Sequence, residues 1–235
     1  MNTPRIIAAL FAAFIFVFCT PVNAEKQELP EVTEDGLHLV PDSKLAIVYA
    51  EPGATLAGYR RVKLLDAYVA FKKNWERDQR SRSLSRLSSD DIEKIKEGLA
   101  REFAVIFTQV LEDGGYPVVD EVADDVLLLR PAIINLDVAA PDSARAGNTR
   151  SFVPSAGEMT LYLEAYDSVT SDLIAKAMDR KADRRNDGYY TWANTVTNKV
   201  AADRILRGWA TILLDALNEA TQSGAAVAGA AENES

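Results

Sequence analysis

The sequence has little of the two residues that most metal sites and many catalytic sites use. Its 235 residues include one cysteine, Cys19, and one histidine, His38. A single histidine excludes most histidine-paired nucleophiles and most transition-metal sites. A catalytic base needs a converging partner, and the sequence shows none for His38, so we predict a structural role for it. No metal and no cofactor are therefore expected.

The sequence also lacks an apolar run long enough to span a membrane. Its longest run covers residues 6–18 and follows Arg5, whereas a spanning helix needs roughly 20 apolar residues. A short apolar run after a positive charge, followed by small residues at Val22 and Ala24, is typical of a secretory signal peptide. We therefore predict a signal peptide over residues 1–24, cleaved before Glu25, and a periplasmic or otherwise exported mature chain with no transmembrane helix.

Cys19 supports a minor alternative, because lipoproteins carry an acylated cysteine directly after the apolar run. The residue before it is the bulky Phe18, whereas the lipoprotein peptidase requires a small residue at that position. Cleavage before Glu25 is therefore the favoured interpretation, and lipid anchoring at Cys19 is the alternative.

The mature chain is acidic and contains no cysteine. Removal of residues 1–24 takes away Arg5 and leaves 25 basic and 35 acidic residues among 211, a net charge of −10. A chain of this length folds around a hydrophobic core without disulfides, and its charge argues against nucleic-acid binding. We predict a flexible acidic leader over 25–35, a single domain over 36–222 and a disordered tail over 223–235.

Hydrophobic periodicity predicts an α+β domain. Alternating or continuous apolar residues predict strands within 45–49, 62–71, 116–119 and 126–138, and a hairpin over 159–177. Pro131 predicts a bulge or an unpaired stretch within its strand. Apolar spacings of three and four predict two helices, one from about Ser88 to the glycines at 114–115 and one from Asn198 to Leu217. The simplest architecture is a two-layer sandwich, with both helices on one face of a mostly antiparallel or mixed sheet.

Carboxylates are the only candidates for catalysis. The pair Asp124 and Asp125, or the pair Glu158 and Glu164, could serve as acid and base in a glycosidase, but acids are too frequent here for either pair to be informative. We predict no enzyme activity and a binding or accessory role for another component of the cell envelope. The alternative is a carboxylate-dependent hydrolase that acts on cell-wall or carbohydrate material.

A basic segment is the candidate for partner binding. Residues 72–86 carry a net charge of +4 within an acidic chain, and we predict a long polar connection there. The candidate residues are Lys72, Lys73, Trp75, Arg77, Arg80, Arg82 and Arg86. Trp75 would add an exposed aromatic surface for an unknown envelope protein, peptidoglycan or an anionic lipid. The favoured alternative is a solvated loop whose arginines meet the acids at the start of the following helix.

Four segments carry a resemblance to a known family. They are EDGL at 34–37, GYPVVDE at 115–121, LRPAII at 129–134 and AGEMTLYL at 156–163. In these segments the chain resembles the bacterial family catalogued as domain of unknown function 3313 (DUF3313), whose members are described mainly as lipoproteins. The resemblance implies an envelope location and no assigned activity, so it identifies no functional residue. Phe18 departs from the lipoprotein signal that the family leads one to expect.

We expect the native mature protein to begin at Glu25, because the small residues at Val22 and Ala24 fit the signal peptidase and Phe18 disfavours lipid transfer to Cys19. The intact mass of the protein purified from its host measures this directly. A mass that corresponds to a diacylated chain beginning at Cys19 would contradict the prediction and support the lipoprotein interpretation.

Overall fold

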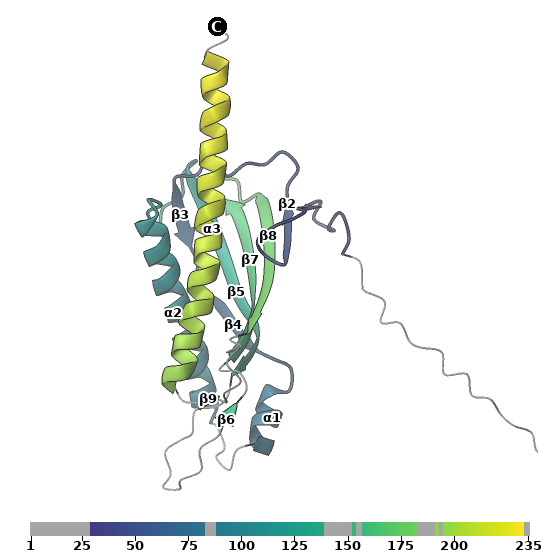
Figure 1. Ribbon diagram of the computed structural model, residues 1–235, viewed down its shortest axis with the longest axis vertical. Helices are drawn as coiled ribbons and strands as arrows, with labels where there is room; N and C mark the ends of the chain where they lie inside the picture. The colour runs from purple at the N-terminus through teal and green to yellow at the C-terminus, as the bar shows by residue number, and fades with distance from the viewer. Residues whose placement is uncertain are drawn as a thin grey trace, which may run out of the picture.

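The computed structural model describes residues 29–82, 88–138, 152–153, 157–182, 191–192 and 195–232. These residues form a mixed β-sheet with two long helices, α2 (Ser89–Asp113) and α3 (Thr195–Glu232), side by side over one face (Figure 1). The two-layer α+β architecture predicted from the sequence is therefore confirmed. The predicted signal peptide lies outside the described residues.

The main sheet has seven strands in the order β1-β2-β8-β7-β5-β3, with β4 also paired to β5. Their bounds are β1 (His38–Leu39), β2 (Ile47–Ala50), β3 (Arg61–Leu64), β4 (Tyr68–Phe71), β5 (Val126–Val138), β7 (Gly157–Asp167) and β8 (Leu173–Ala182). β3 and β4 run parallel to β5, and the other neighbours are antiparallel. The remaining elements are a short helix, α1 (Trp75–Arg82), and a two-stranded sheet of β6 (Phe152–Val153) and β9 (Thr191–Trp192).

Pro131 lies in the central strand β5 without interrupting its pairing to β7. It is opposite Leu163, and the register continues on both sides of it. The C=O of Leu129 faces the other side of β5 and accepts a hydrogen bond from the N–H of Leu65 at 3.0 Å. Backbone N–H and C=O groups two residues apart in a strand point to the same side, so the backbone nitrogen of Pro131, which carries no hydrogen, also points to that side. There β3 ends opposite Leu129 and β4 begins opposite Ala132, so no ladder hydrogen bond is lost at the proline.

Of the two forms predicted for Pro131, the structure confirms the unpaired stretch, and the bulge lies elsewhere in the strand. The register of β5 with β7 shifts between Ile134 and Asp137 instead. Within that interval Asn135 has a φ of 52°, in the left-handed region. Asparagine tolerates this conformation better than most residues, so the extra residue is accommodated at Asn135 and not at the proline.

Two predicted strands differ from the structure. The stretch 62–71 forms two strands, β3 and β4, because the chain changes its position along β5 between them. The stretch 116–119 forms no strand but a single bridge between Val118 and Val62. The strands predicted around 45–49 and 126–138 and the hairpin of β7 and β8 are confirmed.

The predicted start and end of α2 are confirmed. Ser88 caps the helix, because its Oγ accepts a hydrogen bond from the N–H of Asp91 at 3.1 Å while the Asp91 carboxylate accepts one from the N–H of Ser88. Gly114 follows the last turn, and Gly115 has a φ of 88° that favours glycine. Gly114 also lies against α3, where a Cβ atom at this position would come within 2.3 Å of Leu214.

One hydrophobic core lies between the sheet and the two helices. The largest side chains that the helices contribute are Phe103, Ile106, Phe107, Leu111, Leu206 and Trp209. The apolar residues whose spacing predicts α2 are Ile92, Ile95, Leu99, Phe103, Ile106 and Val110. They include Phe103 and Ile106 but not the buried Phe107 and Leu111, because the buried face is wider than one row of side chains. The Trp209 Nε1–H donates a hydrogen bond to the buried Asp179 of β8 at 2.7 Å, which ties α3 to the sheet.

Contacts and helical structure extend into both of the segments predicted to flank the domain. Within the predicted leader, the Tyr49 hydroxyl donates a hydrogen bond to the C=O of Pro30 at 2.9 Å, and Lys176 forms an ion pair with Asp35. α3 begins at Thr195, earlier than the predicted Asn198, and continues to Glu232 through the predicted disordered tail (Figure 1). This segment is rich in alanine, the strongest helix former. None of the helices described is both long enough and apolar enough to cross a membrane.

We expect Phe103→Ala to lower the free energy of unfolding by about 3 to 5 kcal/mol, because the Phe103 ring is fully buried and stacks on Phe107 with a centroid distance of 3.9 Å. Val105→Ala is the control, because Val105 is 63% exposed on the same helix and its truncation should change stability by no more than about 0.5 kcal/mol. Equilibrium unfolding in urea measures both. Equal midpoints for Phe103→Ala and the wild type would contradict the packing of α2.

Candidate functional site

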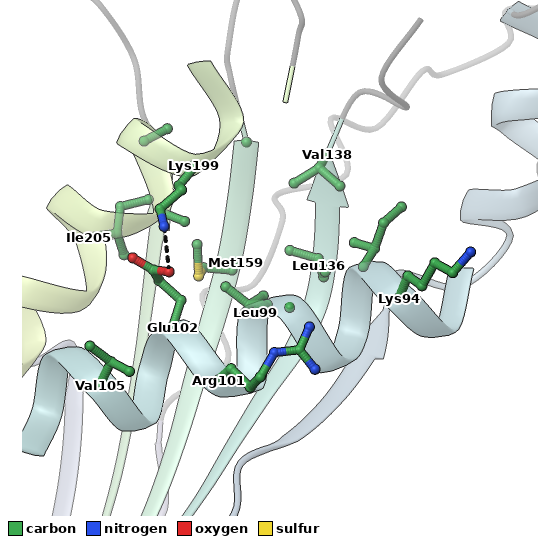
Figure 2. A pocket seen from close by; sticks show the side chains of 15 residues that line it. Lys94, Leu99, Arg101, Glu102, Val105, Leu136, Val138, Met159, Lys199 and Ile205 are labelled. Atoms are coloured by element: carbon green, nitrogen blue, oxygen red, sulfur yellow. Dashed lines mark ion pairs between the residues drawn. The ribbon is translucent and has the colours of Figure 1, made fainter. Parts of the chain in front are cut away.

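A groove of about 550 Å³ lies between α2 and α3 at the end of the sheet where β5 ends and β7 begins (Figure 2). Leu136 and Val138 of β5 and Met159 of β7 lie on the sheet side of the groove. α2 contributes Leu99, and α3 contributes Ile205 from the opposite side. The groove is therefore predominantly apolar and has a size typical of small-molecule sites.

Small residues leave the space that the groove occupies. Gly98 of α2 has no side chain, and a Cβ atom built there would meet only the Arg101 side chain, at 4.0 Å. Ala201 and Ala202 of α3 stand opposite, and Gly157 opens the start of β7. At the other end of this helix pair, Gly114 and Leu214 are in close contact. The helices thus pack tightly at one end and leave the groove at the other.

Charged side chains surround the apolar lining. Among the described residues of the lining, Lys94, Arg101 and Lys199 are basic and Glu102 is the single acid, which gives these residues a net charge of +2. The Lys199 Nζ lies 3.0 Å from Glu102 Oε2 and forms an ion pair between the two helices (Figure 2). An apolar groove with this charge suits a ligand that combines an apolar chain with an anionic group.

The basic segment predicted to bind a partner does not form an exposed aromatic surface. Trp75 begins α1 and is 2% exposed, its ring stacks on Phe71, and its Nε1–H donates a hydrogen bond to the C=O of Val138 at 2.9 Å. The prediction was wrong for this residue because charged neighbours in sequence do not prevent a side chain from turning into the core. The predicted loop is also partly the helix α1.

The basic residues of that segment are only partly described. Lys72 forms an ion pair with Asp137, and Arg77 forms one with Asp78. Lys73 is exposed. Arg80 and Arg82 belong to α1, where only the backbone is described, and Arg86 lies outside the described residues. The role of this set in partner binding stays a prediction.

The carboxylates considered for catalysis do not line the groove. Glu158 pairs with Arg180 at 2.6 Å, and Asp125 accepts a hydrogen bond from Arg61 Nε at 2.9 Å. This hydrogen bond from Arg61 holds the pKa of Asp125 below its usual range. His38 lies exposed on β1, far along the sheet order from β5. Within the described parts of the chain, no cluster of three or more histidine, aspartate or glutamate residues could hold a metal ion.

Glu164 is the centre of a polar cluster on the sheet face away from the helices. It is 6% exposed and accepts hydrogen bonds from Arg130 Nε at 2.6 Å, from the Tyr162 hydroxyl at 2.8 Å and from the Tyr166 hydroxyl at 2.9 Å. Burial alone would raise the pKa of Glu164, but these hydrogen bonds outweigh it and hold the pKa below its usual value. Burial and the same carboxylate raise the pKa of both tyrosines. The carboxylate of Glu164 is satisfied by hydrogen bonds from within the cluster, which is typical of a structural network.

We expect the stabilisation by Glu164 to depend on pH. Because its pKa is lower in the folded than in the unfolded state, its contribution is fully present above about pH 4.5 and is lost as the pH falls through the folded-state value. Glu164→Gln should be less stable than the wild type at neutral pH, and this difference should shrink in acid. Urea unfolding at several pH values measures it, with Glu97→Gln on the exposed side of α2 as the control. A difference that is constant with pH would contradict the network.

No pattern in the sequence predicted the groove. Its lining comes from α2, β5, β7 and α3, and no motif connects Lys94, Glu102 and Lys199 along the chain. The only local signal is small residues on otherwise apolar helix faces, Gly98 on α2 and the alanines at 201–202 on α3. Such residues are too frequent in helices to identify a site by themselves.

Comparisons with solved structures give matches of low similarity. A neuraminyllactose-binding hemagglutinin homolog from Helicobacter pylori is 12% identical, with a TM-score of 0.37, over 76% of this chain and 92% of that chain. The PelC dodecamer from Paraburkholderia phytofirmans is 10% identical, with a TM-score of 0.36, over 68% of this chain and 93% of that chain. A Xanthomonas campestris protein of the DUF330 family is 16% identical, with a TM-score of 0.33, over 71% of this chain and 92% of that chain. Values this low support no argument about function or assembly.

Comparison with curated proteins gives no significant match. Comparison with protein families gives a match to the one described as protein of unknown function (DUF3313), over residues 37–213. This range begins just before β1, ends within α3 and includes α2, the first part of α3 and every strand of the main sheet. The resemblance found in four sequence segments thus extends over most of the domain, and the chain belongs to the DUF3313 family.

Proposed function

We propose that the mature chain is an exported, non-catalytic binding module of the bacterial cell envelope, and that the groove between α2 and α3 binds an apolar chain that carries an anionic group. The groove is the observation that supports the proposal: an apolar lining of about 550 Å³ with a net charge of +2 in an acidic protein. The signal peptide predicted over residues 1–24 supports export.

The apolar lining of the groove favours the apolar chain of such a ligand, and its basic residues favour the anionic group. Leu99, Leu136 and Met159 offer apolar surface, and transfer of an acyl chain from water to such a surface is favourable by roughly 25 cal/mol per Å². Lys94 and Arg101 stand on α2 at the groove and favour a carboxylate or phosphate near the surface. Envelope lipids and their acidic derivatives combine both features. The ligand class follows from this combination.

A hydrolase that uses two carboxylates finds less support at this site. Glycosidases place an acid and a second carboxylate on either side of the bond that they cleave. Among its described lining residues the groove offers one carboxylate, Glu102, and that group is paired with Lys199. Binding is therefore the function that the geometry of the groove supports best.

We expect Gly98→Leu to weaken binding of a fluorescent long-chain fatty acid by about tenfold or more, because the new side chain enters open space in the groove. Gly208→Leu is the matched control, since Gly208 is exposed on α3, outside the groove, and a Cβ atom there meets nothing within 4 Å. Fluorescence titration measures both affinities, and circular dichroism checks that both variants fold.

The charge of the groove is tested with the same probe. The wild type should bind the fatty acid more tightly than its uncharged methyl ester, and Lys94→Glu should reduce this preference. Equal binding by Gly98→Leu and Gly208→Leu, or no binding by the wild type, would overturn the proposed function.

A further inference from the structure

Among the residues that the structure describes, one edge of the main sheet is covered along β3 and open along β4. At β3, the N–H of Val62 donates a hydrogen bond to the C=O of Pro117 at 3.0 Å, and the C=O of Val62 accepts one from the N–H of Val119 at 2.8 Å. β4 pairs with β5 on its inner side, and no described strand or bridge pairs with its outer side. Exposed strand edges bind other chains unless they are covered, so an uncovered segment beside a covered one points to a function.

The groups that face outward from β4 can be identified. The N–H of Lys72 donates a hydrogen bond to the C=O of Leu136 at 3.0 Å, so Lys72 faces β5, and the alternation of the strand places Ala70 on the same side. Val69 and Phe71 therefore turn their N–H and C=O groups away from β5. In the described part of the chain, no hydrogen bond from another element covers these four groups.

A second groove, of about 470 Å³, runs beside this edge. β4 and the residue that follows it, Lys72, form one side of this groove, and Ile92 and Lys96 of α2 form the other. The first turn of α1, with Trp75, also lines it. A strand edge that faces a helix across a groove is the arrangement that accepts an extended peptide, with backbone hydrogen bonds on one side and side-chain contacts on the other.

The charge beside the edge is positive. Lys72, Arg77 and Lys96 line this second groove together with one acid, Glu76, a net charge of +2 in a protein whose overall charge is −9. Each of the three basic residues also forms an ion pair, Lys72 with Asp137, Arg77 with Asp78 and Lys96 with Glu93. These pairs are partly exposed to solvent and therefore weak. An incoming acidic segment would meet Lys72 at the end of β4 and Lys96 across the groove.

We propose that the open edge of β4 binds an extended acidic segment of a partner protein by β-augmentation. The backbone of that segment pairs with Val69 and Phe71, apolar side chains at alternate positions enter the second groove against Ile92, and acidic side chains lie near Lys72 and Lys96. This surface is separate from the groove between α2 and α3, so the two proposals succeed or fail independently.

Amide hydrogen exchange followed by NMR tests the edge itself. In the protein alone, the amides of Val69 and Phe71 should exchange faster than those of Ala70 and Lys72, because only the latter face β5. The probe is a synthetic peptide of about ten residues that alternates valine with glutamate, compared with one that alternates valine with lysine. Addition of the acidic peptide should slow exchange at Val69 and Phe71 by about tenfold or more, and the basic peptide should have a smaller effect.

Two charge reversals on α2 separate this surface from the other groove. Lys96→Glu should weaken binding of the acidic peptide by about tenfold and leave fatty-acid binding unchanged, because Lys96 lines only the second groove. Lys94→Glu is the matched control with the opposite pattern, because Lys94 lines only the groove between the helices.

Three results would overturn the proposal. The first is slow exchange of Val69 and Phe71 in the protein alone, which would mean that the edge is already covered. The second is no change at these amides with about 1 mM acidic peptide. The third is binding of the acidic peptide that protects other amides only or is insensitive to Lys96→Glu, which would place the peptide elsewhere on the protein.

Discussion

The backbone at Pro131 determines how one side of the sheet is built. β5 pairs with β7 through the proline without a break, because the missing N–H faces the opposite side. On that opposite side a single long strand would require the missing donor. The chain instead forms two short strands, β3 and β4, with an unpaired interval at the level of the proline. The division has a consequence for the edge, because residues 117–119 cover β3, whereas no described residue pairs with the outer side of β4.

The two helices that cover the sheet pack against each other unevenly along their length. α3 is held over the sheet by its buried side chains and by the hydrogen bond from Trp209 to Asp179. α2 approaches it closely at Gly114, where a larger residue would collide with Leu214. Toward the other end, Gly98 on α2 and alanines on α3 leave the lining of the first groove unfilled by larger side chains. Close packing at one end and small residues at the other together produce the groove.

Charge is distributed unevenly over this acidic protein. Its buried acids are compensated within the fold, Glu164 by Arg130 and two tyrosines and Asp179 by Trp209 and Lys181. By contrast, the described lining residues of each of the two grooves carry a net charge of +2. Two positive, partly apolar concavities on an acidic chain favour anionic partners at both. The two grooves favour different kinds of anionic partner, because one groove lies between helices and the other follows a strand edge.

Local sequence patterns determined the class of the fold, the ends of α2 and the hairpin of β7 and β8. Each of these depends on residues a few positions apart, such as Ser88 with Asp91, or on the alternation of apolar and polar residues within one element. The family was also recognisable, because its four segments are continuous stretches of the chain. The basic residues at 72–86 were recognisable as a cluster in sequence, but their neighbours in space were not.

Only the tertiary structure decided which side chains meet. It turned Trp75 into the core against Phe71 and Val138, and it assembled the first groove from residues as far apart as Lys94 and Ile205. It also left the edge of β4 without a pairing partner among the described residues, while residues 117–119 covered β3. The physical reason is that periodicity records which face of an element is buried, whereas grooves and open edges depend on how separate elements pack against each other.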